Sequence, residues 1–334
     1  MTIVKRFLAE RGRGTSPVGF GCMSFGGMYG PTSEAESLGA MRAALDLGVT
    51  FWDTANVYGD GVSETLIGRF FDETPGARGR VMLASKFAIA RTPEGKRRID
   101  NSRAHMRESL DASLKRLRTD HIDLYYLHRF DPAVPIEETV GHMADEVKAG
   151  RIGAIGLSEI APDTLRRAAE VHPIAAVQSE YSLWSRAPEL GLIQACAELG
   201  ALFVAFSPVG RGYFGGTPID PTSLPASDFR ATNPRFLGRD WQRNLARREP
   251  FLALAASWGV APAALAIAWT MARGDHVVPI PGTRSAEHLV ENASAAAIEL
   301  TTERLAEIER ILPAGFAAGE RYSPAQWMNI ERYG

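Results

Sequence analysis

Four polar residues with complementary chemistry follow short apolar runs in the first half of the chain. They are Asp53, Tyr58, Lys86 and His128. A free tyrosine has a pKa of about 10, and a nearby ammonium group lowers it by stabilising the phenolate. Lys86 would supply that charge, and Asp53 would hold Lys86 by an ion pair. His128 would donate a hydrogen bond to the substrate oxygen. This set suits reduction of a carbonyl, whose oxygen gains negative charge as hydride arrives and then needs a proton.

Taken one at a time, these residues have ordinary structural explanations. A lysine or aspartate after an apolar strand is often half of a structural ion pair, and a lone histidine is more often a hydrogen-bonded polar residue than a catalytic one. The chemical interpretation therefore depends on a fold that brings all four residues to one place.

The chain contains eight short runs rich in Val, Ile, Phe and Tyr, which alternate with longer amphipathic stretches. Predicted strands cover residues 18–22, 50–55, 81–87, 122–128, 153–158, 175–180, 202–207 and 277–281, and predicted helices include residues 33–47, 63–71, 102–116, 136–149 and 188–199. Repeated strand–helix units predict an α/β fold, a single (β/α)8 TIM barrel. In such a barrel the carboxyl ends of the strands meet at one mouth, where functional groups gather.

Three segments lie outside this alternation. Residues 3–14 precede the first unit and are expected to form a small hairpin across the barrel floor. Residues 215–244 are rich in Gly, Pro, Ser, Asp and Arg and form a long loop that resembles a lid. The tail after Pro313 either folds over the mouth or packs on the outside. No linker or composition change divides the chain, so residues 1–334 are expected to form one domain.

Composition restricts the class of partner. Hydrophobic residues make up 45% and charged residues 23%, and the formal charge is −2 from 37 Lys plus Arg and 39 Asp plus Glu. No basic field exists to bind nucleic acid or a membrane surface, so a small molecule is the expected partner. Cys22 and Cys196 are expected to be free thiols. The sequence shows no signal peptide and no apolar run of membrane-spanning length, which favours a cytoplasmic location.

The residues around the four polar groups resemble a known family. The segments DTA at 53–55, YG at 58–59, SK at 85–86 and LH at 127–128 resemble the catalytic tetrad of the aldo-keto reductase superfamily. The resemblance continues through GFGCM at 19–23, GLS at 156–158, QSEY at 178–181, FSPVG at 206–210 and IPGT at 280–283. It implies the barrel fold, NADPH/NADP+ bound in an extended form, and reduction of an aldehyde or ketone to an alcohol.

The same resemblance implies a set of cofactor-binding residues. Ser158 and Gln178 match the pair that holds the nicotinamide carboxamide, and Phe206 matches a stacking tyrosine. The remaining matches, beside the pyrophosphate and around the adenosine phosphate, are Ser207, Val209, Gly210, Arg211, Gly282, Thr283, Arg284, His288, Glu291 and Asn292. Arg284 is expected to bind the 2′-phosphate, which NADH lacks. The alternative for Arg284 is a solvated surface arginine.

Two departures from the family pattern affect the cofactor site. Glu159 replaces an asparagine that often follows Ser158, which puts one carboxamide contact in question. His288 replaces an arginine near the 2′-phosphate, which weakens the expected preference for NADPH. With YSLW at 181–184, Glu159 resembles the branch that contains perakine reductase and auxin-induced-protein-like reductases.

Apolar and aromatic residues near the mouth are candidates for a substrate wall. Met23, Trp52 and Trp184 are the candidates by position, although aromatics at these sites could equally belong to the core.

Four other functions fit the sequence less well than carbonyl reduction. Residues 210–215 match G-x-G-x-x-G after a strand, but the Gly- and Pro-containing segment that follows cannot open the helix of a dinucleotide-binding fingerprint. A barrel aldolase would use Lys86 as a Schiff-base nucleophile and leaves Tyr58 and Arg284 without a role. A non-catalytic sensor would bind NADPH with little turnover. A metal hydrolase is set aside, since the seven histidines lack ligand spacing and no metal site is expected.

Overall fold

A computed structural model describes residues 15–92 and 94–333 and confirms the predicted barrel. The hairpin predicted for residues 3–14 lies outside these residues. Eight strands form one sheet in the order β1-β2-β3-β6-β7-β8-β9-β10, and each neighbouring pair in that order is parallel. The strands are β1 (Phe20–Gly21), β2 (Phe51–Asp53), β3 (Met82–Phe87), β6 (Leu124–Leu127), β7 (Ile155–Ser158), β8 (Ile174–Glu180), β9 (Leu202–Phe206) and β10 (Val277–Ile280).

Backbone hydrogen bonds between the first and last strands close the barrel. Gly19 N donates to Pro279 O at 2.8 Å, and Gly21 N donates to Pro281 O at 3.0 Å. The seam is tight: a Cβ on Gly21 would lie only 2.9 Å from Ile280 O. Glycine is therefore required where these two strands meet.

Side chains alternate along the strands between the barrel interior and the helix layer. Phe51, Tyr126 and Val204 belong to a buried cluster formed by inward-facing residues. Trp52 and Phe203 belong to the larger cluster that the strands share with the helices. This alternation decides which strand residues can reach the mouth.

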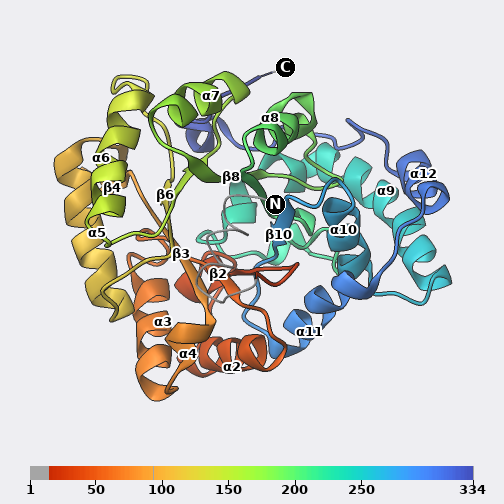
Figure 1. The fold of residues 1–334 in the computed structure, drawn as a ribbon. Helices are drawn as coiled ribbons and strands as arrows, with labels where there is room; N and C mark the ends of the chain where they lie inside the picture. The colour runs from red at the N-terminus through yellow and green to blue at the C-terminus, as the bar shows by residue number, and fades with distance from the viewer. Residues whose placement is uncertain (1–14, 93, 334) are drawn as a thin grey trace.

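The helices form a ring around the sheet (Figure 1). They are α2 (Glu34–Asp46), α3 (Val62–Glu73), α4 (Ala77–Arg80), α5 (Arg103–Leu117), α6 (Ile136–Lys148), α7 (Pro162–Val171), α8 (Leu192–Glu198), α9 (Gly238–Ser257), α10 (Pro262–Met271), α11 (Ala286–Ser294) and α12 (Thr302–Ile311). Helix α2 begins at a capping box, in which Ser33 accepts from Glu36 N and Glu36 accepts from Ser33 N.

Segments outside the strand–helix repeat cover the mouth. An antiparallel hairpin of β4 (Ile89–Arg91) and β5 (Arg97–Ile99), which the sequence did not predict, follows β3 directly. The long loop after β9 contains the short 3₁₀ helices η4 (Pro221–Ser223), η5 (Phe229–Thr232) and η6 (Pro234–Phe236). The prediction that this loop extends to residue 244 is wrong, because α9 already begins at Gly238.

Among the described residues, no single helix is long and apolar enough to cross a membrane, although α9 and α10, bent by 90° at their junction, pass the same test as a pair.

Candidate active site

The carboxyl ends of β2 and β3 bring Asp53 and Lys86 together. Both side chains point inward because each lies two residues from an inward-facing neighbour, Phe51 and Ala84 respectively. The Lys86 ammonium forms an ion pair with Asp53 and also donates to Thr54 O at 2.8 Å. Lys86 is fully buried. A buried ammonium needs such partners, and here they also fix its position.

Tyr58 lies on the loop after β2 and meets this ion pair. Its hydroxyl is 3.4 Å from Lys86 Nζ. The backbone of Tyr58 and Gly59 packs directly on Gly26, where a Cβ would lie 2.6 Å from the Tyr58 carbonyl carbon. Gly59 itself has a φ of 61°, in the left-handed region. Two glycines therefore allow the close contact that orients the tyrosine.

The protonation states of this group differ in part from the sequence expectation. Burial raises the pKa of Tyr58, and the opposing effect of the Lys86 charge is not large enough to lower it overall. The expected net lowering is thus wrong for the protein without ligands, because desolvation outweighs attraction. Burial disfavours the charge on Lys86, but Asp53 and Tyr58 raise its pKa above the usual value. At neutral pH the site holds a neutral phenol beside an ammonium.

His128 follows β6 and faces Tyr58, with ring centroids 6.0 Å apart. Burial lowers the pKa of His128 well below its usual value, and the charges of Arg129, Lys86 and Arg97 lower it further. The imidazole is therefore neutral at pH 7. Its buried Nδ1 makes no hydrogen bond within the described chain.

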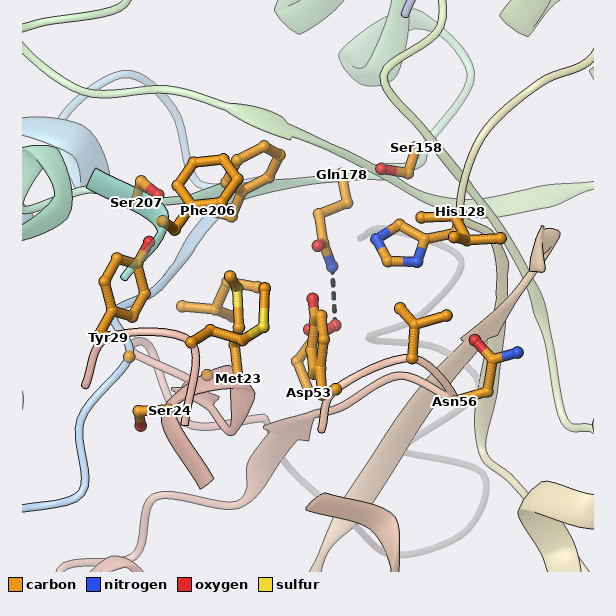
Figure 2. Close-up of a pocket in the computed structure, with 18 of the residues that line it drawn as sticks. Met23, Ser24, Tyr29, Asp53, Asn56, His128, Ser158, Gln178, Phe206 and Ser207 are labelled. Atoms are coloured by element: carbon orange, nitrogen blue, oxygen red, sulfur yellow. Dashed lines mark hydrogen bonds between the residues drawn. The ribbon is translucent and has the colours of Figure 1, made fainter. Parts of the chain in front are cut away.

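These residues border one cavity of about 1020 Å³ at the carboxyl ends of the strands. Figure 2 shows Phe206, Ser207, Tyr29 and Met23 on one side of it and His128 and Ser158 on the other. The sequence-predicted residues that line it are Met23, Asp53, Tyr58, His128, Ser158, Gln178, Phe206, Ser207, Val209, Arg211, Gly282, Thr283, Arg284 and His288. Lys86 lies behind this surface.

At the inner end of the cavity, amide and hydroxyl side chains lie beside the ion pair of Lys86 and Asp53. Gln178 Nε2 donates to Asp53 Oδ2 at 2.7 Å, as the dashed line in Figure 2 marks. Ser158 Oγ, on the neighbouring strand, accepts from Arg129 Nη1 at 3.4 Å. Asp53 thus connects Lys86 on one side with Gln178 on the other.

The outer end of the cavity carries positive charge. Arg284 lies just before α11 and donates to Tyr29 O at 3.2 Å and Gly30 O at 3.4 Å. Arg211 pairs with Glu180 and lies between the rings of Phe229 and Tyr322, 4.7 Å from each centroid. The buried Nη1 of Arg211 has no hydrogen-bond partner in the described residues. Arg284 can receive an anion, and Arg211, although paired with Glu180, keeps this Nη1 for a further acceptor.

Several predicted site residues lie away from the cavity wall. Trp52 packs between helices, with its ring stacked on Phe71 at 5.9 Å, because it alternates with the inward-facing Asp53. Trp184 stacks on Phe236 at 5.5 Å beneath the long loop. The other predicted residues outside the lining are Lys86, Gly210, Glu291 and Asn292. The structure therefore keeps only Met23 of the three predicted substrate contacts at the cavity.

The cavity also contains residues that sequence reasoning missed. Tyr29, Arg97, Arg129 and Tyr322 all line it. Arg129 directly follows His128 at a strand end, so its position alone gave a usable signal. Arg97 lies on the unpredicted hairpin, and its sequence carries no such signal. The sequence left open whether the tail after Pro313 covers the mouth or packs on the outside. Because Tyr322 lines the cavity, part of the tail folds over the mouth.

Glu159 does not extend into the cavity as the asparagine it replaces was expected to. Its carboxylate accepts from Glu180 N at 2.8 Å and pairs with Arg321 of the tail at 2.5 Å. The backbone at Glu159 has a φ of 56°, in the left-handed region. Glu159 therefore anchors the tail at the mouth.

Comparisons with known proteins match this chain to one family over most of its length. The model of the aldo/keto reductase family matches residues 17–313. An NADP(+) aldo-keto reductase, yakc, of Schizosaccharomyces pombe is 41% identical over 324 residues, 96% of this chain and 95% of its own. Probable aldo-keto reductase 1 of Glycine max is 41% identical over 316 residues, 94% of this chain and 90% of its own.

Solved structures of related proteins also superpose on most of this chain. A glycerol dehydrogenase from Gluconobacter oxydans superposes with a TM-score of 0.82 at 28% identity, covering 93% of this chain and 94% of its own. An aldo-keto reductase from Klebsiella pneumoniae in complex with NADPH superposes with a TM-score of 0.71 at 28% identity, covering 92% and 95%.

Proposed function

Because this chain belongs to the aldo/keto reductase family, we propose that it reduces an aldehyde or ketone to an alcohol with NADPH and that Tyr58 donates the proton. The observation that carries this proposal is the contact of the Tyr58 hydroxyl with Lys86 Nζ at 3.4 Å, on the wall of the cavity and beside His128. A positioned general acid contributes roughly 10²- to 10⁴-fold to a rate.

The residues around the cavity fit NADPH. Ser158 and Gln178 would hold the carboxamide, Phe206 would offer its ring to the nicotinamide, and Arg284 would bind the 2′-phosphate. Among the described residues, the Arg284 guanidinium donates hydrogen bonds only to the backbone carbonyls of Tyr29 and Gly30, so a dianionic phosphate would be a stronger acceptor. When bound, the cofactor supplies hydride to the carbonyl carbon.

The chain's own residues handle the proton. The raised pKa of Tyr58 keeps its proton on the phenol until the substrate oxygen becomes negative. As the phenolate forms, the buried Lys86 ammonium stabilises it at close range. The neutral His128 can donate a hydrogen bond to the same oxygen, because a neutral imidazole carries one N–H. Asp53 keeps Lys86 charged and in place.

The ion pair also argues against the aldolase alternative. An amine attacks a carbonyl only when it is unprotonated, and the raised pKa of Lys86 keeps the ammonium form. The membership in the perakine-reductase branch is part of this proposal and rests on Glu159 together with residues 181–184.

The test combines binding and turnover in one sample. NADPH binding is followed by quenching of intrinsic fluorescence, and NADPH oxidation is then measured with aromatic aldehydes, α-dicarbonyls and ketones. We expect Tyr58→Phe to lose about 10²- to 10⁴-fold in kcat with an unchanged Kd for NADPH. Tyr213→Phe is the control, since the Tyr213 hydroxyl donates to Asn244 O outside the cavity.

Each other outcome has a distinct meaning. Turnover by Tyr58→Phe at the wild-type rate would remove Tyr58 as the proton donor. Binding without turnover by the wild type would favour an NADPH sensor, and borohydride trapping of a carbonyl substrate on Lys86 would favour the aldolase. No binding of NADPH or NADH would overturn the proposal.

A further inference from the structure

Most arginines that line the cavity already have a carboxylate partner. These pairs are Arg91 with Asp60, Arg98 with Asp100, Arg116 with Glu64, Arg211 with Glu180 and Arg230 with Asp228. Arg284 belongs to the proposed cofactor end. Two lining arginines remain, Arg97 and Arg129, and within residues 15–92 and 94–333 no carboxylate pairs with either of them.

Arg129 is built into the wall next to the reacting centre. It is 7% exposed, follows His128 directly, and donates through Nη1 to His128 O at 2.6 Å and to Ser158 Oγ at 3.4 Å. Its buried Nε makes no hydrogen bond with the described residues. Burying a charged group this deeply without an opposite charge is costly, so the site is incomplete without an anion.

Arg97 reaches the same wall from the β4–β5 hairpin. Its Nε is also buried without a hydrogen-bond partner in the described part of the chain. Burial and then the charge of Arg129 lower the pKa of Arg97 to about 10, so the guanidinium is still charged at neutral pH. Two like charges therefore converge beside His128, and an anion between them would relieve their repulsion.

We propose that Arg97 and Arg129 form an anion subsite that selects carbonyl substrates bearing a carboxylate. The inference rests on the proposed function and names its substrate class. Arginine suits this role because its planar fork binds a carboxylate through two parallel hydrogen bonds. Arg129 would hold the carboxylate close to the reacting carbonyl, and Arg97 would bind it from the hairpin side.

The test compares each acid with its methyl ester, which removes the negative charge and adds one methyl group. We would measure kcat/KM with NADPH for 3- and 4-carboxybenzaldehyde and for the methyl ester of each. The expected wild-type preference for the acids is about 10- to 100-fold, the range of a charge-assisted hydrogen bond. Arg97→Met and Arg129→Met should each abolish most of this ratio, and Arg129→Lys should retain part of it.

Arg98→Met is the matched control, because Arg98 lies beside Arg97 in the chain but pairs with Asp100 at 3.0 Å. It should keep the acid-to-ester ratio. The proposal is wrong if the wild type does not prefer the acids, or if Arg97→Met and Arg129→Met lower kcat/KM for acid and ester equally.

A binding measurement separates this proposal from the reductase proposal. If the wild type oxidises no NADPH with any probe, the reductase proposal fails, and calorimetry of acid and ester binding still tests the subsite. Tighter binding of the acids that Arg97→Met removes would support the subsite, and equal Kd values for acid and ester would overturn it.

Discussion

At the scale of single residues, the position of Tyr58 depends on Gly26, a neighbour that has no side chain. Gly26 packs against the Tyr58–Gly59 backbone so closely that a methyl group there must displace one of them. The proposed proton donor is thus positioned by a backbone contact with Gly26, a residue that has no chemical role of its own.

We therefore expect Gly26→Ala to lower kcat by about 100-fold, the effect of a displacement near 1 Å at a reacting group. The Kd for NADPH should change little. Gly39→Ala is the control, because a Cβ at Gly39 meets nothing within 4 Å and the position lies inside α2. Steady-state kinetics that show the same kcat for Gly26→Ala and the wild type would rule out this role.

The buried, neutral His128 makes stability depend on pH. Its folded pKa lies well below the unfolded value of about 6.5, so the unfolded chain takes up a proton that the folded chain does not. This contribution to stability is complete above pH 6.5 and is lost as the pH falls toward the folded pKa.

We expect the wild type to lose up to about 1.4 kcal/mol per pH unit from this group below pH 6.5, and His128→Gln to lack that loss. Urea unfolding at pH 7.5, 6.5, 5.5 and 4.5 measures the difference between the two proteins. A difference that stays constant with pH would show that His128 does not contribute in this way.

Residue patterns predicted that Asp53, Tyr58, Lys86 and His128 lie together because strand ends are easy to locate in the sequence. Asp53, Lys86 and His128 each end an apolar run, and the structure brings them together with Tyr58. The error at Trp52 was avoidable, since strand alternation places Trp52 outward once Asp53 points inward. The convergence of Arg97 with Arg129 on one cavity wall was not predictable, because it depends on the β4–β5 hairpin, for which the sequence gives no signal.

At the scale of elements, a salt bridge between residues far apart in the sequence holds the tail at the mouth. Arg321 pairs with Glu159 at 2.5 Å, with side-chain exposures of 15% and 2%. The guanidinium of Arg321 also lies 4.8 Å from the Tyr322 ring centroid. Removing Arg321 would leave the Glu159 carboxylate buried with one backbone donor.

We expect Arg321→Met to destabilise the protein by about 3 kcal/mol, the usual cost of an uncompensated buried charge. The double variant Glu159→Gln, Arg321→Met should recover part of this loss, because it removes the charge that was left behind. Urea unfolding of the four proteins in the cycle measures the coupling. Equal losses in Arg321→Met and the double variant would contradict the argument.

Element boundaries were least predictable where local signals are absent. Helix α9 begins at Gly238 after Leu237, without a side-chain cap, and contains Pro250. Its first residues therefore resemble the loop that precedes them. The β4–β5 hairpin has three residues in each strand, too short for an alternating pattern to stand out. Long, strongly periodic segments such as α5 and α6 were predicted nearly to their ends.

At the scale of the whole molecule, the cofactor is expected to stabilise the fold, because a ligand that binds only the folded state raises its stability. At 100 times Kd the gain is about 2.7 kcal/mol. Because Arg284 is proposed to bind the 2′-phosphate that only NADPH carries, NADPH should bind more tightly than NADH. At equal concentrations it should therefore raise the Tm more. Arg284→Met should reduce the two shifts to the same value, and thermal unfolding that shows equal shifts in the wild type would remove Arg284 from the phosphate site.

The seam of the barrel has a consequence for how the protein is made. Gly19 and Gly21 hydrogen-bond to residues far along the sequence, Pro279 and Pro281. A growing chain cannot form these contacts until residues 279–281 have left the ribosome, and contacts of such long range form slowly. Arg284 and α11 follow that seam directly. If Arg284 binds the nucleotide as proposed, we expect the affinity for the nucleotide to arise only after the barrel has closed.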